Sequence, residues 1–282
     1  FILTSTGNGT CKPVHDTLFV DFQQLPVISS SATTICADNS GAPLSGQYSK
    51  AQGIKWTTTG TGNFLPSDVD LNPTYYPSPA DFLSGNIQIQ LSTTGNGVCP
   101  PATADIAVTV KPAPVIDAGT DKVVCADNPP VNVSGTVANA GGGIWSSSGS
   151  GSFSSDPSLL NVTYNPSIAD IDTGAVRLYF TTTGNGDCFP RVDSMLITIT
   201  PRPVIYAGED QLICPKQTSV TLNATVNNAS GGQWTTTGTG TNSSASSLNN
   251  TYTLSAADYS AGPMMFIVTS TGNGLCQPVK DT

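Results

Sequence analysis

Seven cysteines recur in this chain at spacings that could support disulfide bonds or a metal site. They occupy two positions of a repeated pattern, either 89 residues apart or at the end of a T-G-N-G-x-C segment. The first set is Cys36, Cys125 and Cys214, and the second is Cys11, Cys99, Cys188 and Cys276. A metal site would need a C-x₂-C pair or a nearby histidine, and the sequence has neither. The pattern predicts structural disulfides in an oxidising, extracytoplasmic setting, with buried free thiols as the alternative.

Catalytic chemistry is not indicated by the remaining side chains. A Ser-His-Asp or Cys-His arrangement needs a histidine at each site, and His15 is the only one in the chain. Asp81, Asp170 and Asp258 recur, but each follows S-x-A or a close relative, which suits turn capping better than acid catalysis. We therefore expect no enzyme and no cofactor, although Asp and Asn turns leave calcium as an alternative.

The elements that position these residues belong to tandem repeats. Trp56, Trp145 and Trp234 are also 89 residues apart, and such a register means tandem domains. The period is too long for a solenoid unit and suits a small all-β domain. A mid-strand tryptophan in such a domain is expected in the core, with a sugar-stacking platform as the alternative.

The middle copy shows what one repeat contains. Residues 131–137 and 176–180 alternate apolar and polar side chains, as strands with one buried face do. Turn signals separate about seven such short strands, the profile of an Ig-like β-sandwich. We expect an all-β fold of tandem sandwiches, with boundaries at proline pairs and stiff linkers that produce a rod. The expected division is 1–25 (last two strands of a preceding repeat), 26–113, 114–202 and 203–282 (a repeat lacking its last strand).

Composition excludes several classes of partner. Only 10% of the residues are charged and the net charge is −9, against about 25% charged residues in ordinary domains. No basic stripe is present for nucleic acid or an anionic membrane, and no apolar run approaches the ~20 residues of a membrane span. The chain opens and stops inside a repeat, as a piece of a longer polymer of one module would.

These motifs resemble a known family. The string P-V-I-x-A-G-x-D at residues 114–121 and 203–210, with the mid-domain tryptophan, is similar to the opening of PKD-type Ig-like domains. The first copy departs from it at residues 27–31. The W-T-T-T-G-T-G, S-x-A-D and T-T-x-G-N-G-x-C strings look like giant repetitive surface proteins of Bacteroidetes, such as mobile gliding-motility adhesins. This resemblance implies type IX export, a cell-surface position, adhesion, and O-glycosylation at Thr17 and Ser194, for which a chance match is the alternative.

Three disulfide patterns are open. Cysteines could pair within a repeat, across a linker, or between one repeat and the next. In an Ig-like sandwich the two cysteine positions of one repeat lie at opposite ends, beyond the ~7 Å Cα separation that a disulfide allows. In a head-to-tail array the bottom of one domain meets the top of the next, which favours Cys36–Cys188 and Cys125–Cys276. Cys11, Cys99 and Cys214 then need partners outside the chain.

The expected function is structural. We expect a stiff, disulfide-stabilised spacer in a long extracellular adhesin filament at the cell surface, whose partners are neighbouring repeats. One alternative is a glycan-binding array that gains avidity on surface polysaccharide. Another is a set of accessory repeats on a secreted polysaccharide-degrading enzyme.

Overall fold

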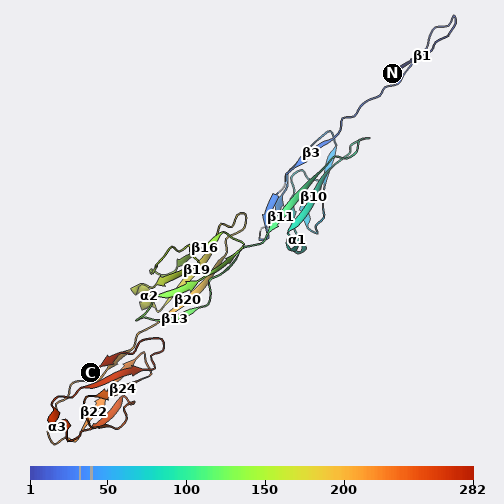
Figure 1. Cartoon of the computed structure of the whole chain (residues 1–282). Coiled ribbons are helices and arrows are strands. Elements are labelled where there is room, and N and C mark those ends of the chain that lie inside the picture. The colour runs from blue at the N-terminus through green and yellow to red at the C-terminus, as the bar shows by residue number, and fades with distance from the viewer. Residues whose placement is uncertain (32, 39–40) are drawn as a thin grey trace. The chain divides into compact units, whose positions relative to one another are not determined.

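The computed structural model describes residues 1–31, 33–38 and 41–282, which form two compact units. Unit 1 comprises Phe1–Ala113 with the segment Gly186–Phe189. Unit 2 comprises Pro114–Asn185 and Pro190–Thr282. Nearly all of the regular secondary structure in both units is β-strand (Figure 1).

The repeat at residues 114–202 is an Ig-like sandwich of two sheets. One sheet has the order β13-β20-β19-β16, in which β13 runs parallel to β20 and the other neighbours are antiparallel. The other face carries β14-β18-β17 and the pair β12-β15. The bounds are β12 Val115–Asp117, β13 Lys122–Cys125, β14 Val131–Ser134, β15 Thr136–Ala138, β16 Gly142–Ser147, β17 Ser152–Phe153, β18 Asn161–Asn165, α2 Ile168–Thr173, β19 Ala175–Thr183 and β20 Val192–Thr200.

The chain changes sheets within the P-V-I-x-A-G-x-D string at residues 114–121. Residues 115–117 and 123–125 flank a turn and their apolar pattern would suit one interrupted strand, but β12 pairs with β15 while β13 pairs with β20 in the other sheet. Gly119 makes the turn with φ +84°, a conformation that glycine adopts without strain. The carboxylate of Asp121 then accepts a hydrogen bond from the Leu196 N–H at 2.8 Å. This crossover sets β13 beside the last strand of the repeat.

The repeat at residues 26–113 has the same topology, with the order β4-β11-β10-β7 and β4 parallel to β11. Residues 1–25 contribute only the hairpin β1-β2. The bounds are β1 Ile2–Thr4, β2 His15–Thr17, β3 Val27–Ser30, β4 Thr33–Cys36, β5 Ala42–Pro43, β6 Gly46–Ser49, β7 Gly53–Thr58, β8 Asn63–Leu65, β9 Thr74–Tyr76, α1 Pro79–Ser84, β10 Asn86–Thr94 and β11 Thr103–Lys111.

The repeat at residues 203–282 lacks most of one edge. The sequence interpretation left out its whole last strand, whereas the structure shows the first two residues of that strand, β28, paired with β27. No strand equivalent to β13 is assigned at residues 208–218, and Leu212 there is fully exposed. In the repeat at 114–202, β13 pairs with the last strand, β20. In the repeat at 203–282 the last strand is represented only by the two residues of β28, so residues 208–218 have little to pair with. The bounds are β21 Val204–Tyr206, β22 Ser219–Asn223, β23 Thr225–Asn227, β24 Gly231–Thr236, β25 Thr241–Asn242, β26 Asn249–Thr253, α3 Asp258–Ala261, β27 Phe266–Thr271 and β28 Lys280–Asp281.

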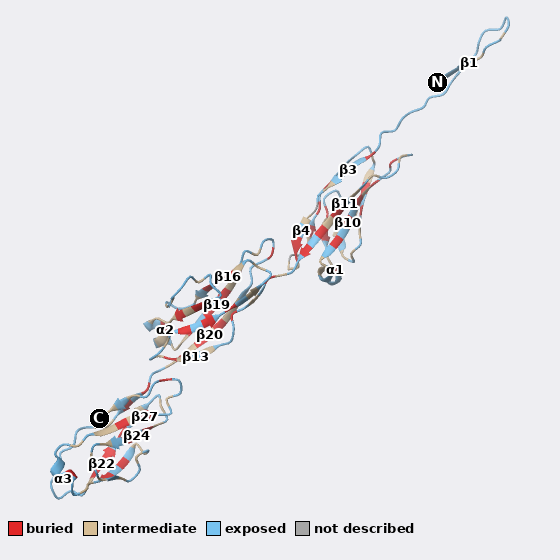
Figure 2. Ribbon diagram, viewed as in Figure 1, coloured by how far each residue is buried: buried red, intermediate tan, exposed pale blue. Residues whose placement is uncertain are grey.

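The cores lie between the sheets, on the buried positions that alternate along the strands (Figure 2). Trp56, Trp145 and Trp234 are 1–2% exposed, so they cannot serve as sugar platforms. The indole N–H of Trp56 donates to the Asp70 carbonyl oxygen at 2.8 Å. The Trp145 ring stacks on the Phe180 ring, with a distance of 4.4 Å between the ring centroids. Each tryptophan thus fills the core while its polar atom keeps a partner.

Candidate functional site: two disulfide joints

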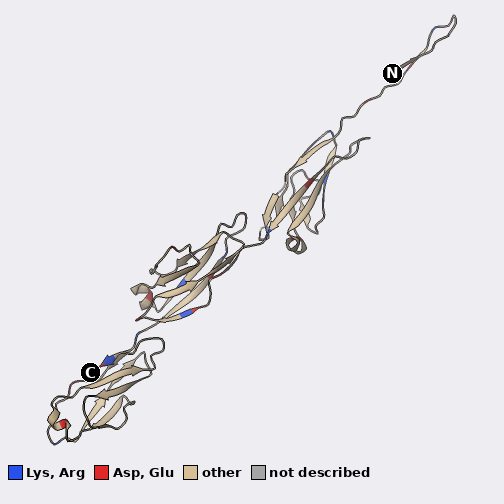
Figure 3. Cartoon of the chain, viewed as in Figure 1, with Lys and Arg blue, Asp and Glu red and all other residues tan. Residues whose placement is uncertain are grey.

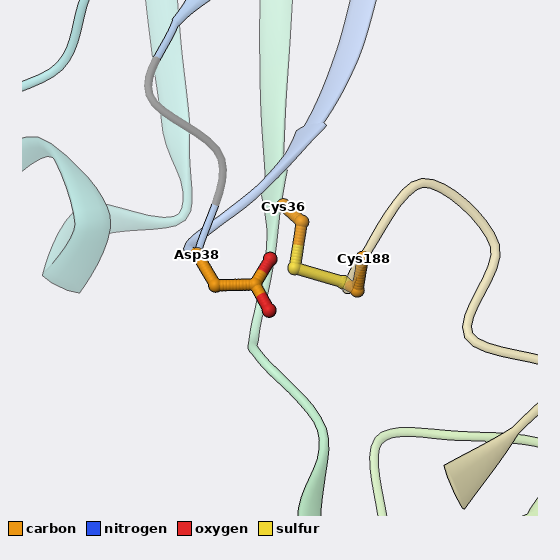
Figure 4. A group of neighbouring side chains, drawn as sticks. All are labelled: Cys36, Asp38 and Cys188. Carbon is orange, nitrogen blue, oxygen red and sulfur yellow. A yellow bond between two sulfur atoms is a disulfide. The ribbon is translucent and has the colours of Figure 1, made fainter. Parts of the chain in front are cut away.

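The first disulfide lies in unit 1 and joins Cys36 to Cys188, with their Cα atoms 5.0 Å apart (Figure 4). Cys36 is the last residue of β4, which runs parallel to β11 and pairs it with Lys111. The parallel pairing therefore brings the cysteine to the end of the sheet from which the chain leaves for the next repeat. Cys188 belongs to the T-G-N-G-x-C loop between β19 and β20. We call this bond and its surroundings joint 1.

The second disulfide repeats this arrangement inside unit 2. It joins Cys125, the last residue of β13, to Cys276 in the loop after β27, with a Cα separation of 5.1 Å. Cys125 pairs in register with Thr200, whose hydroxyl lies 3.7 Å from the Cys276 sulfur. We call this joint 2. The two bonds are the pairs that the strand-order argument favoured, and each links one repeat to the following one in sequence.

The loop cysteine in each joint also contacts the linker before its own repeat. The sulfur of Cys188 lies 3.8 Å from the Pro112 carbonyl oxygen, and that of Cys276 lies 3.6 Å from the Pro201 carbonyl oxygen. All four bonded cysteines are at most 8% exposed. Because a reductant must reach the sulfur to attack it, this burial protects both joints.

Sequence reasoning missed a carboxylate in each joint. Asp38, two residues after Cys36, accepts a hydrogen bond from the Phe189 N–H at 3.4 Å. Asp127, two residues after Cys125, accepts one from the Gln277 N–H at 2.8 Å. The signal was present in the sequence as C-A-D after two of the three strand cysteines. The acid side chain thus links the strand cysteine's turn to the residue that follows the loop cysteine.

The other three cysteines carry thiols. Cys11 and Cys214 are exposed and Cys99 is half-buried. The Cys99 thiol lies 3.9 Å from the carbonyl oxygen of Gln23, in the chain just before its own repeat. This is the contact that the loop cysteines make in the two joints.

The recurring aspartates form a buried clamp with a tyrosine. In the repeat at 114–202 the Tyr164 hydroxyl donates to Asp170 at 2.9 Å, and the Gly151 and Ser167 N–H groups donate to the same carboxylate at 3.0 and 2.9 Å. Asp170 also closes a capping box with Ser167 at the start of α2. Tyr75–Asp81 and Tyr252–Asp258 repeat the contact at 2.8 and 2.9 Å. The aspartates therefore cap turns, as the S-x-A-D pattern indicated.

The clamp shifts the titration of its members. Burial by itself raises the pKa of Asp170, but hydrogen bonds from Ser167 and Tyr164 outweigh it and hold that pKa below its usual value. The pKa of Asp81 is lowered for similar reasons. That of Asp258 is lowered first by the N–H of Thr239. Burial, and to a lesser extent the neighbouring carboxylate, raises the pKa of Tyr164.

The remaining candidate residues stay apart from the joints. Thr17 ends β2 and is exposed, and the Ser194 hydroxyl, within β20, accepts from the Arg177 guanidinium at 3.2 Å. His15 Nδ1 lies 2.8 Å from the Thr4 hydroxyl at the surface. Charged residues are sparse along the whole chain (Figure 3). Within the described residues, groups of three potential metal ligands occur only at the two joints, where the sulfurs are already bonded to each other.

Comparisons with known proteins concern shape alone. No protein-family model matches the chain, and no curated protein matches it. A titin I67–I69 variant of three Ig domains is 11% identical with a TM-score of 0.48, over 90% of this chain and 95% of that one. The eight N-terminal Ig domains of DSCAM are 13% identical with a TM-score of 0.42, over 91% of this chain and 41% of that one. Sidekick-1 Ig domains 1–5 are 12% identical with a TM-score of 0.39, over 98% of this chain and 64% of that one. These values are low, so the case for Ig-like repeats rests on the sheet topology itself.

Two further observations concern surroundings. In the described part of the chain, no helix has the length and apolar character needed to cross a membrane. The two disulfides fit an oxidising environment.

Proposed function

We propose that this chain is a spacer segment of a long extracellular filament, in which disulfide joints fasten each repeat to the next. The observation that carries the proposal is that both disulfides link consecutive repeats, from a strand end to the T-G-N-G-x-C loop. A disulfide that only stabilised a sandwich would join two strands of the same repeat, as the inter-sheet bridge of antibody domains does.

The joints give neighbouring repeats two covalent connections instead of one. Between β20 and β21 the peptide linker is three residues long, and joint 2 forms the second connection beside it. Two connections at different points resist bending about either of them. Each bond closes a loop with a sequence separation of 151 or 152 residues, worth about 5 kcal/mol in the chain-entropy model. A fibre made in this way would transmit force without opening at its linkers.

The resemblance in the motifs supports a more specific setting. Giant surface adhesins of gliding Bacteroidetes display such repeats, and the proposed filament would hold an adhesive tip away from the cell. Export by a type IX system, a cell-surface position and O-glycans at Thr17 and Ser194 belong to this proposal. The low content of charged residues suits a fibre that must not adhere indiscriminately to charged surfaces.

The proposal is tested by the freedom of one repeat relative to the next. Fluorophores at the exposed positions Ile168 and Tyr259, introduced through non-canonical amino acids, report the distance distribution between the two repeats in single molecules. We expect the Cys125→Ser variant to broaden this distribution, while the matched Cys99→Ser variant, which loses only a thiol, leaves it unchanged. Equal widths in all three proteins would contradict the spacer function. Glycan binding by a protein with equally mobile repeats would favour the binding-array alternative instead.

A further inference from the structure

The two joints share a second contact that two of the unpaired cysteines cannot make. In both joints the residue two positions after the strand cysteine is an aspartate, which accepts the N–H of the residue after the loop cysteine. The loop of Cys99 is followed by Pro100, which has no N–H to donate. The strand cysteine Cys214 is followed by Pro215 and Lys216, so it has no carboxylate there.

The loop half of a joint is already formed where no disulfide is present. The Cys99 N–H donates to the Asn96 carbonyl oxygen at 3.1 Å, and the Cys276 N–H donates to Asn273 at the same distance in joint 2. The Cys99 sulfur also lies near a carbonyl oxygen of the chain before its repeat, as the bonded loop cysteines do. The sulfur-to-oxygen distance is 3.9 Å for Cys99, 3.8 Å for Cys188 and 3.6 Å for Cys276. The matching loops of this chain are bonded to another copy of the repeat, which points to another copy as the partner of the Cys99 loop as well.

We propose that the residue two after the strand cysteine and the residue after the loop cysteine form a matched pair that selects which repeats are joined. Repeats whose strand cysteine begins a C-x-D string form disulfides with loops in which the residue after the cysteine has an N–H, as in joints 1 and 2. The Cys99 loop takes a strand cysteine of another repeat copy that lacks this carboxylate, of the kind found at Cys214. The inference rests on the proposed function, because it presumes that joints hold the array together.

The selection has a simple physical basis. A C-x-D repeat joined to a loop of the Cys99 kind would place its carboxylate against a proline, with no N–H to bind. Joining C-P-K to a loop with an N–H would leave that N–H to water. Loss of one such hydrogen bond corresponds to a roughly five-fold change in equilibrium. In a mixture of repeats, C-x-D strands therefore occupy the loops with an N–H and leave the C-P loops to strands without the carboxylate.

Joint 2 of the full chain allows the pair to be tested without a second molecule. The protein is equilibrated in glutathione buffers, and the closed fraction of Cys125–Cys276 is measured by differential alkylation and mass spectrometry, with Cys11, Cys99 and Cys214 changed to serine. Asp127→Lys and Gln277→Pro each remove one side of the pair. A proline at this position is compatible with the loop, because Pro100 follows Cys99 and is itself followed by Pro101, as Gln277 is by Pro278. Gln277→Ala, which keeps the N–H, is the matched control.

We expect each single variant to lower the closing constant of joint 2 roughly five-fold. The double variant should be no lower than either single one, because the contact is lost only once. The alanine control should match the starting protein. Additive losses of roughly twenty-five-fold in the double variant, or no loss in either single variant, would overturn the inference. If Cys125–Cys276 is absent from the starting protein itself, the proposed function fails first, so the two failures are distinguishable.

Discussion

The joints predict how far the chain can be extended when it is pulled by its ends. A covalent path through closed disulfides runs along residues 1–36, crosses joint 1, returns along residues 188–125, crosses joint 2 and leaves along residues 276–282. This path has about 104 residue steps, which at ~3.5 Å each gives a full extension of about 36 nm. The reduced chain has about 281 steps and should reach about 98 nm.

Removing one joint has a small effect because the two loops interleave. With Cys36→Ser or Cys125→Ser, the remaining disulfide leaves a path of about 130 residue steps, or about 45 nm. Losing the first joint therefore adds about 9 nm, and losing the second adds about 53 nm. Two disulfides within separate repeats would not show this strong dependence on order, since each would release its own loop independently.

Single-molecule force spectroscopy on the full chain measures these lengths directly. The oxidised protein, the two single-serine variants and the protein in reductant are stretched until every repeat has unfolded, and the contour length is fitted. A Cys99→Ser variant is the control and should match the starting protein. Disulfides across the linkers, from Cys11 to Cys36 and so on, would give about 71 nm for the oxidised chain. That length, or equal gains from the first and second joint removed, would refute the proposed pairing.

Three further predictions concern the sandwiches. Trp145→Ala should lower the free energy of unfolding by about 3–5 kcal/mol because the indole is buried, whereas the exposed Val115→Ala should leave the urea midpoint nearly unchanged. Tyr164→Phe should cost about 1–2 kcal/mol by removing the hydroxyl bound to Asp170, and Tyr179→Phe, at an exposed position in the other sheet of the same repeat, should cost little in the same denaturation assay. The folded-state pKa of Asp170 lies below the unfolded value of 3.8, so its stabilisation is complete above about pH 4 and is lost as the pH falls through the folded-state pKa. Asp170→Asn should accordingly weaken the loss of stability between pH 4 and 2, as followed by urea midpoints.

Much of the fold could be predicted because the repeat is written several times. The equal spacing of the tryptophans located the core, and the S-x-A-D string indicated the caps before α1 and α2. The position of Cys125 relative to Cys188 was set by general Ig-like strand order. These predictions used features that recur in register, so that each copy checked the others.

Other features depend on contacts between distant residues and could not be read from a pattern. The change of sheet between β12 and β13 is one of these features, because residues 115–125 show apolar segments on both sides of a turn and nothing local reveals that the two segments pair in different sheets. The clamp of Tyr164 with Asp170 needs two side chains that meet only after β18 and α2 have formed. The role of Asp127 was hidden because its partner, the Gln277 N–H, lies 150 residues away.

The disulfide pairing is tested directly by a non-reducing peptide map of the full chain, alkylated before digestion and analysed by mass spectrometry. We expect Cys36–Cys188 and Cys125–Cys276 as the linked peptides, with alkylated thiols at the three other cysteines. A map with Cys125 linked to Cys188 within one repeat, or with Cys99 linked to Cys125 across a linker, would contradict the claim that disulfide joints fasten each repeat to the next.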